Sequence, residues 1–177
     1  MQRLSQTILF ITFFFYFSSY ALTTSIGMSG AYLIMDDSSL GNGYLIQGRV
    51  TLIPVKYLGI YGEYGIGRGY ISGDSNYSIS PVYAGVDTIL PAKRWLSIFA
   101  DIGFGYTKSV KIISVAPVSK FSMRIGGGIS FFQNIRYPIY FGFGFFRSFI
   151  KDMINSDVIK FKLIDNMQFS AFVGYNL

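Results

Sequence analysis

A two-residue alternation over residues 95–107 is the feature that most limits what this chain can fold into. One series consists of Ile98, Ala100, Ile102, Phe104 and Tyr106. The intervening series consists of Phe99, Asp101, Gly103, Gly105 and Thr107. Because the side chains of a β-strand point alternately to its two faces, this stretch predicts a strand with one apolar face and one small or polar face. A soluble sheet and a membrane barrel both show such a pattern, so the rest of the chain must decide which way the apolar face points.

Composition favours an apolar exterior. The chain has 177 residues, of which 51% are hydrophobic and only 14% are charged, whereas about a quarter is usual for soluble domains. This length suits one domain, and the charges are too few to cover a surface that faces water. Cysteine and histidine are both absent. Their absence excludes disulfides, thiolate metal sites, the commonest metal ligand and the commonest general base, so we expect no metal, no cofactor and no catalytic residues.

The N-terminus predicts export. Arg3 precedes an apolar run at residues 8–17, and residues 19–21 form a small-x-small cleavage site. The apolar run is shorter than the roughly 20 residues of a spanning helix, which argues against an uncleaved anchor. We therefore predict a cleaved signal peptide at residues 1–21 and a single mature domain at residues 22–177.

No later segment predicts a spanning helix. The most apolar one, residues 139–150, is too short and contains Arg147. In lipid, all backbone polar groups must be satisfied internally, which leaves a closed β-barrel as the way for this chain to cross a membrane.

The mature chain divides into eight candidate strands. They span residues 24–35, 43–53, 57–67, 81–90, 95–107, 120–132, 138–149 and 166–177. Short turns alternate with longer polar loops, which is typical of outer-membrane barrels. Pro81 is expected at the beginning of a strand or in a bulge, because proline cannot donate to the ladder. The predicted fold class is all-β, an eight-stranded antiparallel up-and-down transmembrane β-barrel.

The alternation places five charged side chains inside this barrel. They are Arg49, Glu63, Asp87, Asp101 and Arg124. An eight-stranded barrel is just wide enough for side chains to fill. An unpaired charge there would cost several kcal/mol, so we predict an ion network. Its surplus acid would be balanced by water, by Gln47 or by a raised pKa. The network can act as a structural plug or as a narrow gated path for ions or small solutes. A secreted lipocalin-like barrel is the alternative, and it requires the opposite orientation of the two faces.

The signal peptide, the eight alternating strands and the final strand at residues 169–177 together resemble a known family. The chain is similar to the small outer-membrane barrels of Gram-negative bacteria, namely the OmpA-type transmembrane domain and the OmpX- and opacity-type proteins. This resemblance implies localisation in the bacterial cell outer membrane. It also implies recognition of the last strand by the barrel-assembly machinery through Phe169, Val173 and Tyr175, although Leu177 replaces the usual terminal phenylalanine. Some barrels of this size are lipid A deacylases or palmitoyltransferases that depend on a histidine, so this histidine-free chain is expected not to be an enzyme.

The residues of the predicted loops indicate which partners the protein contacts. Lys108, Lys111 and Lys120 are expected to contact lipid head groups, including lipopolysaccharide phosphates. Residues 112–118 are apolar enough to extend the strands beyond the membrane and to contact a host or surface ligand, as an adhesin does. The rival hypothesis is a purely structural role. Nucleic acid is excluded as a partner by export, despite an isoelectric point near 9.5.

Overall fold

The computed structural model describes residues 23–35, 40–55, 57–71, 75–110, 118–133, 138–151 and 166–177. The predicted signal peptide lies outside these residues. No helix in the described part of the chain is long and apolar enough to cross a membrane.

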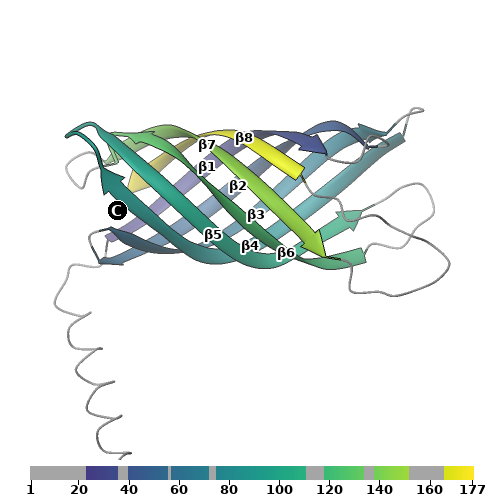
Figure 1. Ribbon diagram of the computed structural model, residues 1–177, viewed down its shortest axis with the longest axis horizontal. Coiled ribbons are helices and arrows are strands. Elements are labelled where there is room, and N and C mark those ends of the chain that lie inside the picture. The colour runs from purple at the N-terminus through teal and green to yellow at the C-terminus, as the bar shows by residue number, and fades with distance from the viewer. Residues whose placement is uncertain are drawn as a thin grey trace, which may run out of the picture.

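The described residues form eight antiparallel strands that close into a barrel (Figure 1). The strands are β1 (Thr23–Met35), β2 (Leu40–Val55), β3 (Leu58–Ile71), β4 (Ser75–Pro91), β5 (Leu96–Val110), β6 (Val118–Phe131), β7 (Ile139–Lys151) and β8 (Asn166–Asn176). Each strand pairs with its neighbour in sequence, and β1 pairs with β8 to close the barrel. The predicted fold class is therefore confirmed.

The two ends of the barrel differ. The turn end carries the β2–β3, β4–β5 and β6–β7 connections and both ends of the described chain (Figure 1, left). The opposite end, here called the loop end, carries the other four connections. Toward the loop end several strands run further than predicted: β3 continues to Ile71, and β5 to Val110. Long strands of this kind can carry side chains beyond the thickness of a bilayer, since each residue adds about 3.3 Å.

Pro81 lies inside β4, so the prediction that a strand begins there is wrong. The β3–β4 register is the same on both sides of Pro81, so the alternative prediction of a bulge is wrong as well. β4 starts at Ser75, and the β3–β4 pairing is interrupted between Tyr64–Val82 and Gly67–Ile79. The interruption removes the need for a backbone N–H at Pro81. A Cβ on Gly65 would lie 3.1 Å from Cγ of Pro81, so the proline ring sits against a glycine that leaves room for it.

The alternation predicted from the sequence holds along the strands. In β5, Ile98 and Ile102 are exposed on the outside, whereas Phe99 and Asp101 are buried inside. The interior also contains two apolar clusters. One, toward the loop end, consists of Ala31, Leu33, Met35, Leu45, Tyr77 and Ile79. The other consists of Ile89, Phe99 and Phe146, with Ile53 and Phe172 packed against it. The interior is thus filled by side chains, as expected for an eight-stranded barrel.

Candidate functional site

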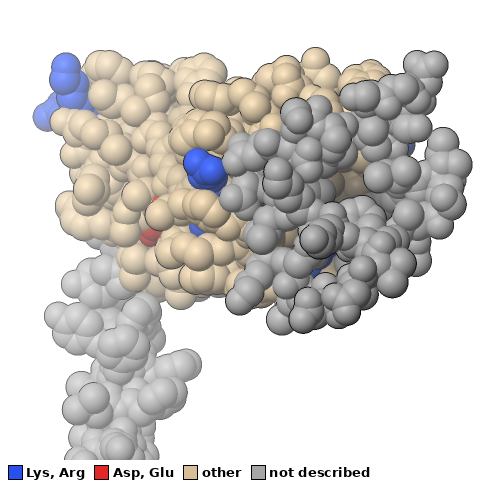
Figure 2. Space-filling model, turned by 45° about the vertical axis from the view of Figure 1, so that its right-hand side comes forward, with Lys and Arg blue, Asp and Glu red and all other residues tan. Residues whose placement is uncertain are grey.

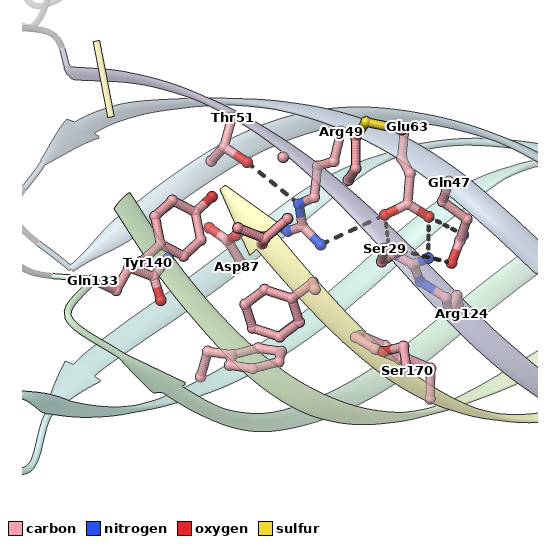
Figure 3. A pocket seen from close by; sticks show the side chains of 16 residues that line it. Ser29, Gln47, Arg49, Thr51, Glu63, Asp87, Arg124, Gln133, Tyr140 and Ser170 are labelled. Carbon is pink, nitrogen blue, oxygen red and sulfur yellow. Dashed lines mark hydrogen bonds and ion pairs between the residues drawn. The ribbon is translucent and has the colours of Figure 1, made fainter. Parts of the chain in front are cut away.

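The structure brings together all five charged residues that the sequence places inside the barrel. They come from five successive strands, β2 to β6. Arg49 is paired in register with Glu63, and Asp87 with Asp101. Strand pairing thus supplies two neighbouring pairs, and the curvature of the barrel turns both pairs and Arg124 toward a common centre. Figure 3 shows Arg49 between Asp87 and Glu63.

Arg49 connects three acidic side chains. Its Nη2 lies 2.6 Å from Oδ2 of Asp87, and its Nη1 lies 2.8 Å from Oδ2 of Asp101 and 3.7 Å from Oε2 of Glu63. The guanidinium carbon lies 3.6 Å from the centre of the Tyr61 ring. Arg49 therefore combines ion pairs with a cation–π contact, which is a geometry that suits guanidinium better than ammonium.

Arg124 is the most deeply buried member of the network, with a side chain that is 0% exposed. Both of its terminal nitrogens donate to Glu63, Nη1 to Oε1 and Nη2 to Oε2 at 3.0 Å. Its Nε donates to Oδ1 of Asp101 at 3.4 Å. The rings of Tyr83 and Phe146 cover the guanidinium at 4.9 and 4.7 Å. This bidentate, ring-covered geometry fixes Arg124 across the lumen.

Two neutral residues complete the network. The Tyr61 hydroxyl donates to Oδ1 of Asp101 at 3.0 Å and accepts from Arg124 at 3.3 Å. Nε2 of Gln47 donates to Oε1 of Glu63, in line with the predicted role of this amide. Tyr61 was not singled out from the sequence, although it precedes Glu63 by two residues and therefore shares its face. The alternation alone could have identified it.

Beside the network lies a small cavity of about 60 Å³. Its lining includes Arg49, Asp87 and Tyr140 together with Phe99 and Phe172 (Figure 3). The volume leaves room for a few water molecules but is well below the roughly 300–1,000 Å³ of a small-molecule pocket. Among the described residues, no group of three or more potential ligands is arranged to hold a metal ion. Chemically, this interior offers paired charges beside a space that fits water.

The three lysines predicted to contact lipid head groups differ in position. Lys108 is exposed on the outer face of β5. Lys120 is 8% exposed and lies opposite buried Thr107, so it belongs to the interior series of β6. The sequence had assigned Lys120 to the boundary of a loop, whereas the strand extends through it and its alternation turns it inward. Lys111 lies outside the described residues.

The outer surface of the described barrel is apolar between its two ends. Large side chains such as Met28, Ile46 and Phe143 are 55–64% exposed. Figure 2 shows a face in which Lys and Arg side chains form only small, separate patches. Within the described ranges, the acidic residues are Glu63, Asp87 and Asp101, and all three are buried. A water-soluble barrel, such as the lipocalin-like alternative, would instead have charged side chains on its outer surface and apolar side chains inside.

Aromatic side chains gather toward both ends of the outer surface. Toward the turn end, Trp95 stacks on Phe131 at 6.0 Å and Phe131 stacks on Phe141 at 5.2 Å. Toward the loop end, the rings of Tyr32 and Tyr44 meet edge to face at 5.6 Å. Two aromatic girdles that flank an aliphatic band are typical of barrels in a lipid bilayer, because these rings prefer the interface.

Fold and surface together define a class: a small eight-stranded transmembrane β-barrel with a filled polar interior and an apolar belt. Solved structures of small outer-membrane barrels share this fold. Neisserial surface protein A matches with a TM-score of 0.64 at 11% identity, over 87% of this chain and 96% of that chain. OprG from Pseudomonas aeruginosa matches with a TM-score of 0.61 at 10% identity, over 89% and 96%. The outer membrane enzyme PagL matches with a TM-score of 0.53 at 14% identity, over 84% and 98%.

No protein-family model matches the sequence. No curated protein matches it either. Because the structural matches include both a surface protein and an enzyme at 10–14% identity, they establish the fold of this chain and leave its role to be argued from its own residues.

Proposed function

We propose that this protein is an integral barrel of the bacterial outer membrane, with a structural or surface-contact role and a lumen closed by side chains. The observation that carries the proposal is the distribution of charge. The described acids and both network arginines lie inside, while the outside presents aliphatic residues between aromatic girdles. Lipid is the solvent that suits such a surface, and a closed barrel satisfies every backbone group within it.

The interior supports a plug rather than an open channel. Arg124 and Asp101 have side chains that are 0% exposed, and Arg49 contacts three acids from three other strands. A narrow gated path is the second candidate, and the cavity of about 60 Å³ beside Arg49 supports it. Conductance in planar bilayers distinguishes them: a plug gives no steps above the lipid background, whereas a gated path gives small, discrete openings.

The proposed partners follow from the two ends of the barrel. Lys108, exposed on β5, suits lipid head groups and lipopolysaccharide phosphates. The final strand, with Phe169, Val173 and Tyr175 on one face, suits recognition by the barrel-assembly machinery during insertion. A catalytic role is not proposed, since the chain lacks the histidine on which the barrel enzymes of the resembled family depend.

The surface-contact role depends on residues 112–118, which fall mostly outside the described part of the chain. Deletion of residues 112–118 should lower adhesion to host cells or matrix while leaving the barrel folded. Unchanged adhesion by a folded deletion variant would leave the structural role as the function.

Membrane insertion has a direct test. The protein is extracted in detergent, and its gel mobility is compared before and after boiling, with circular dichroism of the same sample. A mobility shift with a β spectrum is the expected result. Protein that is recovered in the soluble fraction and shows no shift would overturn the proposal.

A further inference from the structure

Two exposed cations lie close together on the outer surface, toward the loop end. Arg68 is exposed on β3 and Lys108 is exposed on β5, and β4 is the strand between them. On β4, Ser78 is the in-register partner of Arg68, and Ser80 is the partner of Lys108. Two strand spacings and a shift of two residues therefore separate the Cα atoms of Arg68 and Lys108 by about 12 Å.

Ser80 adds a hydroxyl group between the two cations. Its side chain is partly exposed, whereas its neighbours Ile79 and Pro81 are buried in the interior, so Ser80 belongs to the outward series of β4. Arginine and lysine have long side chains, and both can reach an anion that is held over the Ser80 hydroxyl. The described acids all lie inside the barrel. No described acid on the outer surface therefore offsets this positive charge.

The surface next to these cations, toward the middle of the barrel, is apolar and aromatic. Val82 is the in-register partner of Tyr64 on β3 and of Tyr106 on β5. These three side chains are 49–57% exposed. A valine between two larger rings is a surface on which a hydrocarbon chain can pack with a ring on each side. The cations thus stand at the loop-end edge of a surface that suits acyl chains.

We propose that Arg68, Ser80 and Lys108 bind a phosphate group of lipid A, with an acyl chain on the apolar surface beside them. The inference rests on the proposed location in the bacterial outer membrane and deepens it by naming the lipid and its site. The long loops of outer-membrane barrels are extracellular, which places the loop end in the outer leaflet. The phosphorylated lipid of that leaflet is lipid A, an acylated disaccharide.

The chemistry of the three side chains suits this ligand. Guanidinium and ammonium groups bind phosphate by charge-assisted hydrogen bonds, and the serine hydroxyl supplies a further donor. A head-group contact of Lys108 was predicted from the sequence, whereas Arg68 and Ser80 join it only through strand pairing. The site makes β3, β4 and β5 the side of the barrel that selects lipid A.

The test uses photo-crosslinking of the folded protein in phosphatidylcholine nanodiscs, with the labelled peptides identified by mass spectrometry. Three diazirine-acyl probes are compared at equal mole fraction: lipid A with its phosphates, the same lipid A without phosphates, and phosphatidylglycerol. Phosphorylated lipid A should label β3, β4 and β5 in preference to the other strands, whereas the dephosphorylated probe should label all strands evenly. An equal preference shown by phosphatidylglycerol would overturn lipid A as the ligand.

Four variants test the residues of the site. Arg68→Gln and Lys108→Gln should each lower the labelling of β3–β5 by phosphorylated lipid A about fivefold, since a surface cation contributes roughly 1 kcal/mol. Ser80→Asp keeps both cations but places a carboxylate between them, so it should abolish the preference. Arg94→Gln removes an equal charge at the exposed β4–β5 turn, at the opposite end of the barrel, and should leave the preference unchanged.

Two readouts separate the site from the fold. Heat-modifiability and labelling by the dephosphorylated probe should be the same in every variant as in the wild type. Even labelling of all strands of a heat-modifiable barrel by phosphorylated lipid A, or no effect of Arg68→Gln and Ser80→Asp, would overturn the lipid A site alone. Wild-type protein that is soluble and not heat-modifiable would overturn the proposed function as well.

Discussion

Removal of the buried guanidinium by Arg124→Met should be among the most damaging single changes in the barrel interior. Arg124 donates twice to Glu63 and once to Asp101. Methionine keeps much of the side-chain volume but leaves Glu63 with Gln47 and a more distant Arg49 at 3.7 Å. Removing one partner of a buried ion pair costs about 3–5 kcal/mol, because the remaining charge is left uncompensated.

The assay is urea unfolding of the refolded barrel in lipid vesicles, with the heat-modifiable gel band as the measure of the folded fraction. The double variant Arg124→Met with Glu63→Gln removes both charges and should recover part of the loss. Arg94→Gln, at the exposed β4–β5 turn, is the control and should change stability by no more than about 0.5 kcal/mol. A loss below about 1 kcal/mol for Arg124→Met, or no recovery in the double variant, would refute the reasoning that this network is a tightly coupled plug.

Two further perturbations address the lumen and the outer surface. Arg49→Ala removes contacts to three acids beside the cavity, so it should raise single-channel conductance in planar bilayers. The control Lys108→Ala should leave the conductance unchanged. Equal conductance in the wild type and in both variants would contradict the plug. Ile102→Lys puts a charge in the middle of the apolar belt and should lower the free energy of unfolding by about 2–4 kcal/mol. Leu90→Lys, near the turn end, should lower it by about 0–1 kcal/mol. Equal losses in urea unfolding would contradict a membrane-embedded belt.

The two-residue alternation of side chains along a strand explains how much of the structure could be predicted from the sequence. Whether a side chain faces in or out depends only on its place in the alternation, so Arg49, Asp101 and Arg124 could be assigned to the interior from sequence alone. The ends of the strands could not, because they depend on pairing with neighbours. Pro81 shows this, since it looks like a strand start but sits where the β3–β4 pairing is interrupted. Lys120 shows it as well, since a longer β6 turns it inward.

By itself, the sequence determined the architecture: eight alternating strands, an apolar exterior and a charged interior. Only the tertiary structure decided which charges meet, because closure of the barrel brings residues on non-adjacent strands together across the lumen. Arg49 reaches Asp101, 52 positions away, and Arg124 reaches Glu63, 61 positions away. The pairing of Gly30 with Ala171 likewise exists only because closure brings β1 beside β8. Alternation is a local property of the chain, whereas register and closure are set by contacts between strands that are far apart in sequence.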